Sequence, residues 1–197
     1  MRYLKATAQD RCGNGVADTV IVHFYQRHST GIDELHHEAV ATDIDADEIV
    51  DFQCSGDINF DGKSDVVDYW LLKAFANTFL RLNWFNKGES WRRTLMVMAI
   101  QDEANGLPHG VQLNFLDRRH SPLRKPVLVY QAAGYDTDHN GVLESFTAGD
   151  VDRNGVADKD DTALIRSMCI NFLAFKWYDH AHPSLNKFEQ GVDQCAI

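Results

Sequence analysis

Two long stretches of the chain carry hydrophobic residues at helical spacing. Apolar side chains recur every three or four positions over residues 65–86 and again over residues 158–180. Polar residues at intervals of four, Lys73, Asn77 and Arg81, interrupt the first stretch, which predicts a helix with one solvent-facing side. The pattern therefore predicts two amphipathic helices, each beginning directly after an Asp-rich segment.

Shorter apolar or alternating runs predict strands. Gly, Pro and Asn residues separate these runs, as expected for the turns of a mostly antiparallel sheet. The runs are residues 3–8, 19–25, 94–100, 111–116 and 126–131. The first two flank an Asp- and Gly-rich segment, which predicts a hairpin at that place. The pattern does not determine the order of the strands in the sheet.

The segments that precede the two helices carry the same pattern of oxygen-bearing residues. Residues 57–68 and 150–161 both have such side chains at positions 1, 3, 5, 9 and 12, with Gly at position 6. This spacing wraps twelve residues around a hard, oxygen-seeking cation, and position 7 contributes its backbone carbonyl. The candidate ligands are Asp57, Asn59, Asp61, Lys63, Asp65 and Asp68 in the first loop, and Asp150, Asp152, Asn154, Val156, Asp158 and Asp161 in the second.

Three weaker copies of this pattern accompany the two strong ones. Residues 43–51 and 136–144 each begin 14 residues before a strong loop, so a tandem double loop is duplicated at an offset of 93 residues. A fifth copy, residues 10–18, has Cys12 where the third ligand would stand. A solvated turn is the alternative for any single copy, because Asp, Asn and Gly favour turns without a metal. The candidate ligands of these loops are Asp43, Asp45, Asp47, Ile49 and Asp51; Asp136, Asp138, Asn140, Val142 and Glu144; and Asp10, Asn14, Val16 and Asp18.

The distribution of charge agrees with metal loops rather than a generally acidic surface. The five loops hold 19 of the 29 acidic residues, and the remainder of the chain has more basic than acidic residues. Five bound Ca²⁺ ions would offset the formal net charge of −10. We therefore expect Ca²⁺ as the cofactor, with two sites in the strong loops and up to five in all.

The expected fold class is α+β. At 197 residues, with 44% hydrophobic residues, the chain is long enough for one composite globular domain. We predict EF-hand-like calcium loops that each lead into a helix, packed with a small, mostly antiparallel β-sheet. Residues 1–86 would form a first calcium-loop half, residues 87–134 a β-rich insert, and residues 135–197 a second calcium-loop half.

The loop and helix segments 56–73 and 149–166 resemble type I dockerin repeats. The shared features are a leading Gly-Asp, an Asp at position 12 and a Leu-Leu-Lys or Leu-Ile-Arg motif in the following helix. The resemblance implies that Asp65 and Asp158 act through water, that the protein is secreted, and that its partner is a cohesin domain. The residues at the dockerin positions that select a cohesin are Val66, Val67, Lys159 and Asp160.

Four cysteines, Cys12, Cys54, Cys169 and Cys195, predict two disulfides with three alternative connectivities, or else buried free thiols. None has the spacing of a zinc site. Disulfides and calcium loops of moderate affinity both suit an extracellular or cell-surface setting. No signal peptide is visible at the start of the sequence, so we expect a mature form. We also expect no membrane span, because charged residues interrupt the most apolar stretch.

Two other clusters have alternative interpretations. The run of residues 36–38, His-His-Glu, and the pair His180 and His182 would suit a transition metal, but they lack helical zinc spacing and also fit surface or capping histidines. A basic cluster would suit nucleic acid, but no nucleic-acid motif accompanies it, so a solvated loop or a patch facing a neighbour's acidic loops is favoured. This cluster comprises Arg118, Arg119, His120, Arg124 and Lys125.

These patterns favour an extracellular calcium-binding structural or assembly protein. Its partner would be further copies of itself, in an oligomer or filament at the cell surface. The alternative is a dockerin-like docking module that binds a cohesin-like protein. No nucleophile elbow, phosphate-binding loop or dinucleotide motif is present, so we expect no catalytic activity.

Overall fold

The main body of the protein is an eight-stranded antiparallel sheet, with the strands in the order β4-β3-β2-β1-β5-β6-β7-β8. The computed structural model describes residues 1–86, 92–101, 108–118 and 125–178. The strands are β1 (Arg2–Gln9), β2 (Thr19–Arg27), β3 (Asp33–Thr42), β4 (Phe52–Cys54), β5 (Arg93–Gln101), β6 (Pro108–Asp117), β7 (Val127–Tyr135) and β8 (Ser145–Phe146). The helices are α1 (Val66–Leu80), α2 (Asn83–Asn86) and α3 (Lys159–Ala174).

The chain consists of two structurally equivalent halves. Four strands followed by a helix, β1 to β4 and α1, are repeated as β5 to β8 and α3. The strand order reads the same outward from the central pairing of β1 with β5, which relates the halves by an approximate two-fold axis. The strands of the segment 87–134 therefore occupy the places in the second half that β1, β2 and β3 occupy in the first.

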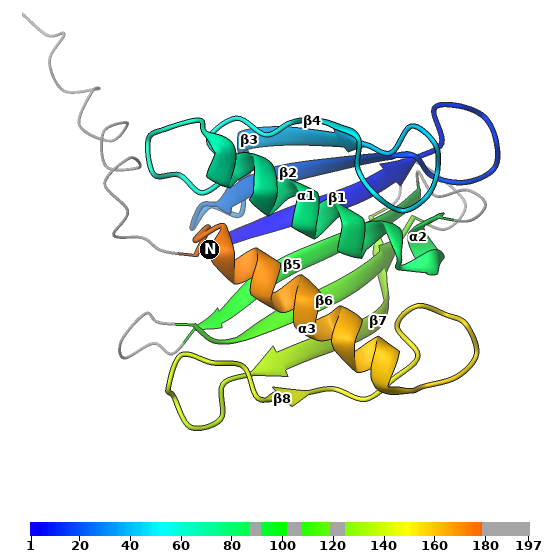
Figure 1. Cartoon of the computed structure of the whole chain (residues 1–197). Helices are drawn as coiled ribbons and strands as arrows, with labels where there is room; N and C mark the ends of the chain where they lie inside the picture. The colour runs from blue at the N-terminus through cyan, green and yellow to red at the C-terminus, as the bar shows by residue number, and fades with distance from the viewer. Residues whose placement is uncertain (87–91, 102–107, 119–124, 179–197) are drawn as a thin grey trace, which may run out of the picture.

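The hydrophobic core lies between the sheet and the two long helices, which lie across one face of the sheet and run in opposite directions (Figure 1). Alternate residues of the central strands face this layer and are fully buried, as the two-residue period of a strand requires. They meet the apolar side of each helix. Prominent core residues are Leu4, Val22, Phe24, Val97, Leu113 and Phe115 from the sheet, and Leu72, Phe75, Phe79, Ile165, Met168 and Phe172 from the helices.

Both long helices begin at a capping box built from loop residues. The Asp65 side chain caps the start of α1, and the Asp68 side chain accepts a hydrogen bond from the Asp65 backbone N–H. Asp158 and Asp161 make the same arrangement at the start of α3. Each cap stabilises its helix by about 1 kcal/mol, because it satisfies backbone donors that have no partner within the helix.

The predicted fold class, α+β with EF-hand-like loop-and-helix units, was wrong, because the protein has a β-rich fold. A small sheet packed with loop-and-helix units was expected, whereas the eight-stranded sheet dominates and the helices form one layer on it. The pattern missed β3, whose first half is polar and exposed, and the short outer strands β4 and β8. The helices are also shorter than predicted, since α1 ends at Leu80 and α3 at Ala174. None of the described helices is long and apolar enough to cross a membrane.

Candidate metal-binding loops

All five predicted loops share one backbone shape. Positions 4 and 6 have positive φ in every loop, a left-handed conformation that favours Gly at position 6 and that side chains at position 4 adopt under strain. The position-4 residues are Gly13, Ala46, Phe60, His139 and Arg153, and the position-6 residues are Gly15, Glu48, Gly62, Gly141 and Gly155. The shared conformation means that the sequence repeat is a repeat of structure as well.

The aspartate at position 1 organises each loop in the same way. In the loop of residues 150–161, one oxygen of Asp150 accepts the N–H of Asn154 at 3.0 Å, and the other accepts the N–H of Gly155 at 2.9 Å. In each of the other loops, the backbone N–H groups of positions 5 and 6 donate to the position-1 carboxylate in the same way. These carboxylates belong to Asp10, Asp43, Asp57 and Asp136. In the loop of residues 150–161, the side chain of Asp152 at position 3 accepts both the backbone N–H and the side-chain amide of Asn154 at position 5.

The loops fall into two lengths that are closed by different positions. In the twelve-residue loops, the last residue turns its carboxylate back to the start: Asp161 accepts the N–H of Val151 at 2.7 Å, and Asp68 accepts the N–H of Ile58 at 2.9 Å. Asp68 and Asp161 are almost completely buried. These two loops connect a strand to a long helix.

The nine-residue loops are closed by position 9. Asp18, Asp51 and Glu144 each accept the N–H of the second loop residue, at 3.0, 2.8 and 3.0 Å. Each of these loops connects two strands. The residue spacing of a loop-and-helix motif therefore occurs here in a hairpin. In the sequence, a short loop is followed by a long one in each half. In the structure, the short loop forms a hairpin between two strands, and the long loop leads into a helix.

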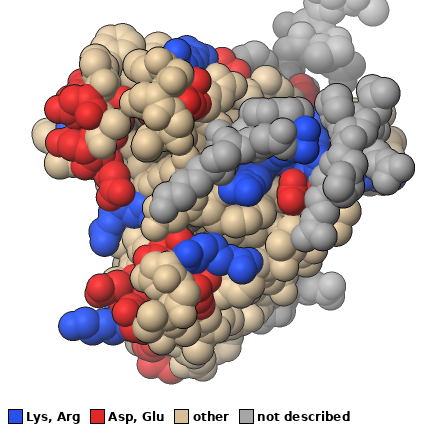
Figure 2. All heavy atoms as spheres, turned by 90° about the vertical axis from the view of Figure 1, so that its right-hand side faces the viewer, with Lys and Arg blue, Asp and Glu red and all other residues tan. Residues whose placement is uncertain are grey.

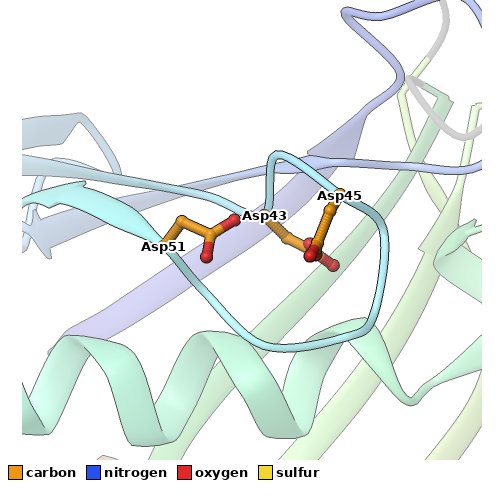
Figure 3. Close-up of side chains that lie close together, drawn as sticks. All are labelled: Asp43, Asp45 and Asp51. Carbon is orange, nitrogen blue, oxygen red and sulfur yellow. The ribbon is translucent and has the colours of Figure 1, made fainter.

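Three loops bring three carboxylates together at metal-binding distance. In each, carboxylate oxygens of three residues lie within 4.8 Å of one another, and the groups are Asp43, Asp45 and Asp51; Asp136, Asp138 and Glu144; and Asp150, Asp152 and Asp161. Figure 3 shows the first group, in which the side chains of Asp43 and Asp45 gather inside the turn and Asp51 points toward them from the other end of the loop. These acidic groups could hold a metal ion.

The loop of residues 57–68 has a different donor set. Its third position is Asn59, so no three of its described carboxylates form such a group. The Asn59 side chain lies beside Asp61: its oxygen accepts the backbone N–H of Asp61 at 3.0 Å, and its amide nitrogen donates to the Asp61 carboxylate at 3.4 Å. The first loop also lacks a three-carboxylate group, because Cys12 stands at its third position. Its thiol is hydrogen bonded to Asp18, and this contact raises the pKa of Cys12.

Repulsion between carboxylates is visible in the electrostatics of the loops. The neighbouring charge of Asp47, with smaller contributions from Asp51 and Asp43, raises the pKa of Asp45. Partial burial and the charges of Asp161 and Asp150 raise the pKa of Asp152. A bound divalent cation would remove this cost, because it attracts each of the charges that now repel one another.

Backbone donors offset the repulsion at the closing positions. The pKa of Asp161 is lowered although its burial opposes the shift, because backbone N–H groups of Asp158, Asp152 and Val151 donate to it. The backbone N–H of Thr137 likewise lowers the pKa of Glu144. These carboxylates are therefore ionised, as ligands of a hard cation must be.

The side chains at position 7 are exposed in all five loops, as expected if only the backbone carbonyl contributes a ligand. They are Val16, Ile49, Lys63, Val142 and Val156. In both long loops the position-4 side chain lies against a ring of the sheet, although Phe60 is partly buried and Arg153 is exposed. Phe60 contacts the ring of His37, and Arg153 lies 5.3 Å over the ring of Tyr130.

The loops lie at opposite ends of the sheet. Residues 10–18, 43–51 and 150–161 lie at one end, and residues 57–68 and 136–144 at the other (Figure 1). Figure 2 looks onto the first end, where two groups of Asp and Glu residues are separated by Lys and Arg residues. Arg92 and Arg118 belong to this end, where the Arg118 N–H donates to the Arg92 carbonyl beside the first residues of β5.

The side chains of residues 36–38, the His-His-Glu run, do not point toward a common metal site; each has a different partner. His37 is hydrogen bonded to the Ser55 carbonyl at 2.6 Å, and Glu38 pairs with His23 at 2.7 Å. His36 is an extra residue at a β-bulge and packs on Trp177. The second pair, His180 and His182, and most of the basic cluster, Arg119, His120 and Arg124, lie outside the described residues.

The described cysteines are free thiols. Cys12 and Cys54 are exposed, and Cys169 is buried in the core, where burial raises the pKa of its thiol to about 12. The predicted disulfides therefore do not join these three cysteines to one another. Cys195 lies outside the described residues.

No family model matches the chain, and neither a curated protein nor a solved structure matches it significantly.

Proposed function

We propose that this protein is an extracellular calcium-binding structural protein whose loops are stabilised in their final shape by bound Ca²⁺. The observation that carries the proposal is the common conformation of the five loops, each with its position-1 carboxylate wrapped by the same backbone donors. A chance Asp-rich turn has no reason to repeat the same two left-handed positions five times. A shared ligand supplies that reason.

Calcium fits the donor chemistry better than other common metals. Apart from Cys12, the ligand positions offer carboxylate, amide and backbone oxygens, which hard cations prefer over soft ones. Ca²⁺ accepts six to eight oxygens at flexible distances, whereas Mg²⁺ demands a smaller octahedron and keeps several waters. Asp57, Asp61 and Asp68 with the Asn59 oxygen, and the equivalent residues of the second long loop, would hold the ion.

The structural role follows from where the loops are placed. The long loops contain the residues that cap α1 and α3, and the short loops join neighbouring strands at the ends of the sheet. A cation in each loop would therefore fix a helix start or a strand pairing. Moderate-affinity loops of this kind are filled at millimolar calcium, which favours a location outside the cell.

We further propose that the protein associates with itself as a surface or filament subunit. Support comes from the end view, in which cationic residues lie between acidic loops and could meet acidic loops of a neighbouring copy (Figure 2). The unpaired stretches of β3 and β7 at the sheet edges are less suitable for pairing with a neighbouring copy. A β-bulge interrupts each strand, at His36 in β3 and at Val129 in β7. We therefore place the contact at the charged ends.

A docking module for a cohesin-like partner is the second candidate. One observation favours it: Val66, Val67 and Trp70 at the start of α1 are exposed by 64%, 48% and 60%. The equivalent positions of α3 hold Lys159, Asp160 and Ala163, so the apolar surface is not a requirement of the fold. Such a surface in one copy alone indicates a partner-specific contact.

Sedimentation of the purified chain with and without calcium tests the choice between the two functions. Growth into larger species at high protein concentration with calcium supports self-association. A monomer under all conditions, together with calcium binding in a calorimetric titration, would move the proposal to the docking module. Absence of calcium binding would contradict both.

A further inference from the structure

Trp177 ties the chain just beyond α3 to the first half of the sheet. The side chain is fully buried, and its indole N–H donates to the carbonyl of Tyr3 at 3.1 Å and to that of Tyr25 at 3.2 Å. The Arg2 guanidinium lies 5.2 Å above the ring. Because those carbonyls belong to β1 and β2, the contact joins the last helix of the second half to the strands of the first.

A calcium-loop residue is part of the same cluster. Phe60, at position 4 of the loop of residues 57–68, has its ring centroid 4.4 Å from that of Trp177, with the planes 31° apart. It also meets Phe24 edge to face at 5.5 Å. Phe60 stands between Asn59 and Asp61, two candidate ligands, and has a φ of 56°. The positions of its ring and of the neighbouring ligand oxygens are therefore determined by the same three residues of backbone.

The duplication provides an internal comparison. Arg153 occupies the equivalent position in the second long loop, and it lies over Tyr130 of the neighbouring strand rather than reaching the other half. The position-4 residues of the short loops are Gly13, Ala46 and His139. Among the described loops, Phe60 is therefore the position-4 residue that packs on Trp177.

We propose that the contact of Phe60 with Trp177 couples cation binding in the loop of residues 57–68 to the packing of the chain beyond α3. The inference rests on the calcium binding proposed above. The carboxylates of an empty loop repel, and the left-handed backbone of Phe60 adds strain, so the binding shape of the loop is costly to form. The ring contact holds the loop in its binding shape and so reduces the cost of ordering it on binding. By linkage, a cation in the loop tightens the packing of Trp177 equally.

The test follows the indole N–H resonance of Trp177 by NMR in the full chain, assigned with Trp177→Phe, while CaCl₂ is added. An Asp150→Ala background removes the equivalent long loop. We expect the resonance to move with the same midpoint as binding to the loop of residues 57–68, and Asp57→Ala to abolish the movement. Phe60→Leu should raise the dissociation constant of this loop about five- to tenfold, whereas Arg153→Leu should leave it unchanged.

The outcomes separate the coupling from the calcium proposal. Calcium binding by calorimetry with an unmoved Trp177 resonance overturns the coupling and leaves calcium binding intact. Unchanged affinity in a folded Phe60→Leu variant overturns it as well. No calcium binding at all overturns the proposed function and the coupling together. Should Phe60→Leu not fold, the titration of the unsubstituted protein decides the question.

Discussion

The side-chain amide of Asn171 donates to the hydroxyl of Thr78 at 3.4 Å, and these two residues occupy equivalent positions in α3 and α1, 93 residues apart. The approximate two-fold axis therefore passes through this contact and through the pairing of β1 with β5 below it. The same offset relates the short loops, the long loops and the bulges at His36 and Val129. Each half consequently serves as a reference for the other.

Glu48→Gly should stabilise the protein by about 0.5 to 1 kcal/mol, because Glu48 holds a left-handed φ of 68° at a position where the other loops have Gly. Its exposed side chain makes this a test of backbone strain. Chemical denaturation measures the change. The matched control is Gly62→Ala, which meets nothing within 4 Å but should destabilise through its φ of 87°. A loss of stability in Glu48→Gly would refute the strain argument.

Asp33→Asn should destabilise the protein by about 1 kcal/mol at neutral pH. Asp33 forms a two-point pair with Arg27, at 2.7 and 3.0 Å, and the pair lowers the pKa of Asp33 to about 2. Arg27 is 42% exposed, so solvent screening reduces the contribution below the full value of the shift.

The pH dependence of this pair has a definite sign. Because the pKa of Asp33 is depressed on folding, its contribution is complete above about pH 4, the ordinary value, and disappears as the pH falls toward 2. The difference between wild type and Asp33→Asn in denaturation should therefore close over that interval. Glu38→Gln, which alters a more exposed contact with His23, is the control. A difference that is as large at pH 2 as at neutral pH would contradict the prediction.

Asp57→Ala and Asp150→Ala should each lower the calcium stoichiometry and the melting temperature more than Asp10→Ala does. The first loop already lacks an oxygen at its third position, where Cys12 stands, so less binding energy is available to lose there. Calorimetric titration and thermal melting of the three variants measure both effects. Equal losses in all three would show that the strong loops do not dominate.

Arg118→Glu should weaken calcium-dependent self-association. Arg118 is exposed at the end of the sheet that carries the loops of residues 10–18, 43–51 and 150–161, and reversal of its charge would repel a neighbour's carboxylates. Calcium should promote assembly by fixing the loops, so chelation should disperse it. Sedimentation velocity gives the measurement, with Arg166→Glu, an exposed cation on α3, as the control. Equal assembly of both variants would place the contact elsewhere.

The loops and the strands β1, β2, β5, β6 and β7 could be predicted from the sequence, whereas the extent of the sheet and its strand order could not. The shape of the loop of residues 150–161 depends on Asp150, Asn154 and Gly155, which lie within six residues of one another, so their spacing is informative. The sheet depends on pairings between distant segments, and its outer strands β4 and β8 have only three and two residues. Such short strands leave no periodicity to detect.

The helices were predicted to be longer than they are, again because contacts between distant segments decide where they end. Apolar residues continue at helical spacing past Leu80, but the N–H of Leu82 bonds to the carbonyl of Phe79 and the chain turns into the separate helix α2. Tertiary packing of Phe85 on Phe79 and Phe115 decides this boundary. The contact of Phe60 with Trp177 is also beyond sequence patterns, because it joins residues far apart in the chain.

Thermal melting with chelator and with millimolar calcium tests the central claim most directly. Carboxylates held about 4 Å apart repel by roughly 4 kcal/mol per pair at an effective dielectric near 20, which opens an empty loop. Saturation at about 100 times the dissociation constant adds roughly 2.7 kcal/mol of stability per site. We therefore predict a melting midpoint that rises by many degrees with calcium and falls again on chelation. An identical midpoint in chelator and in calcium would contradict the account.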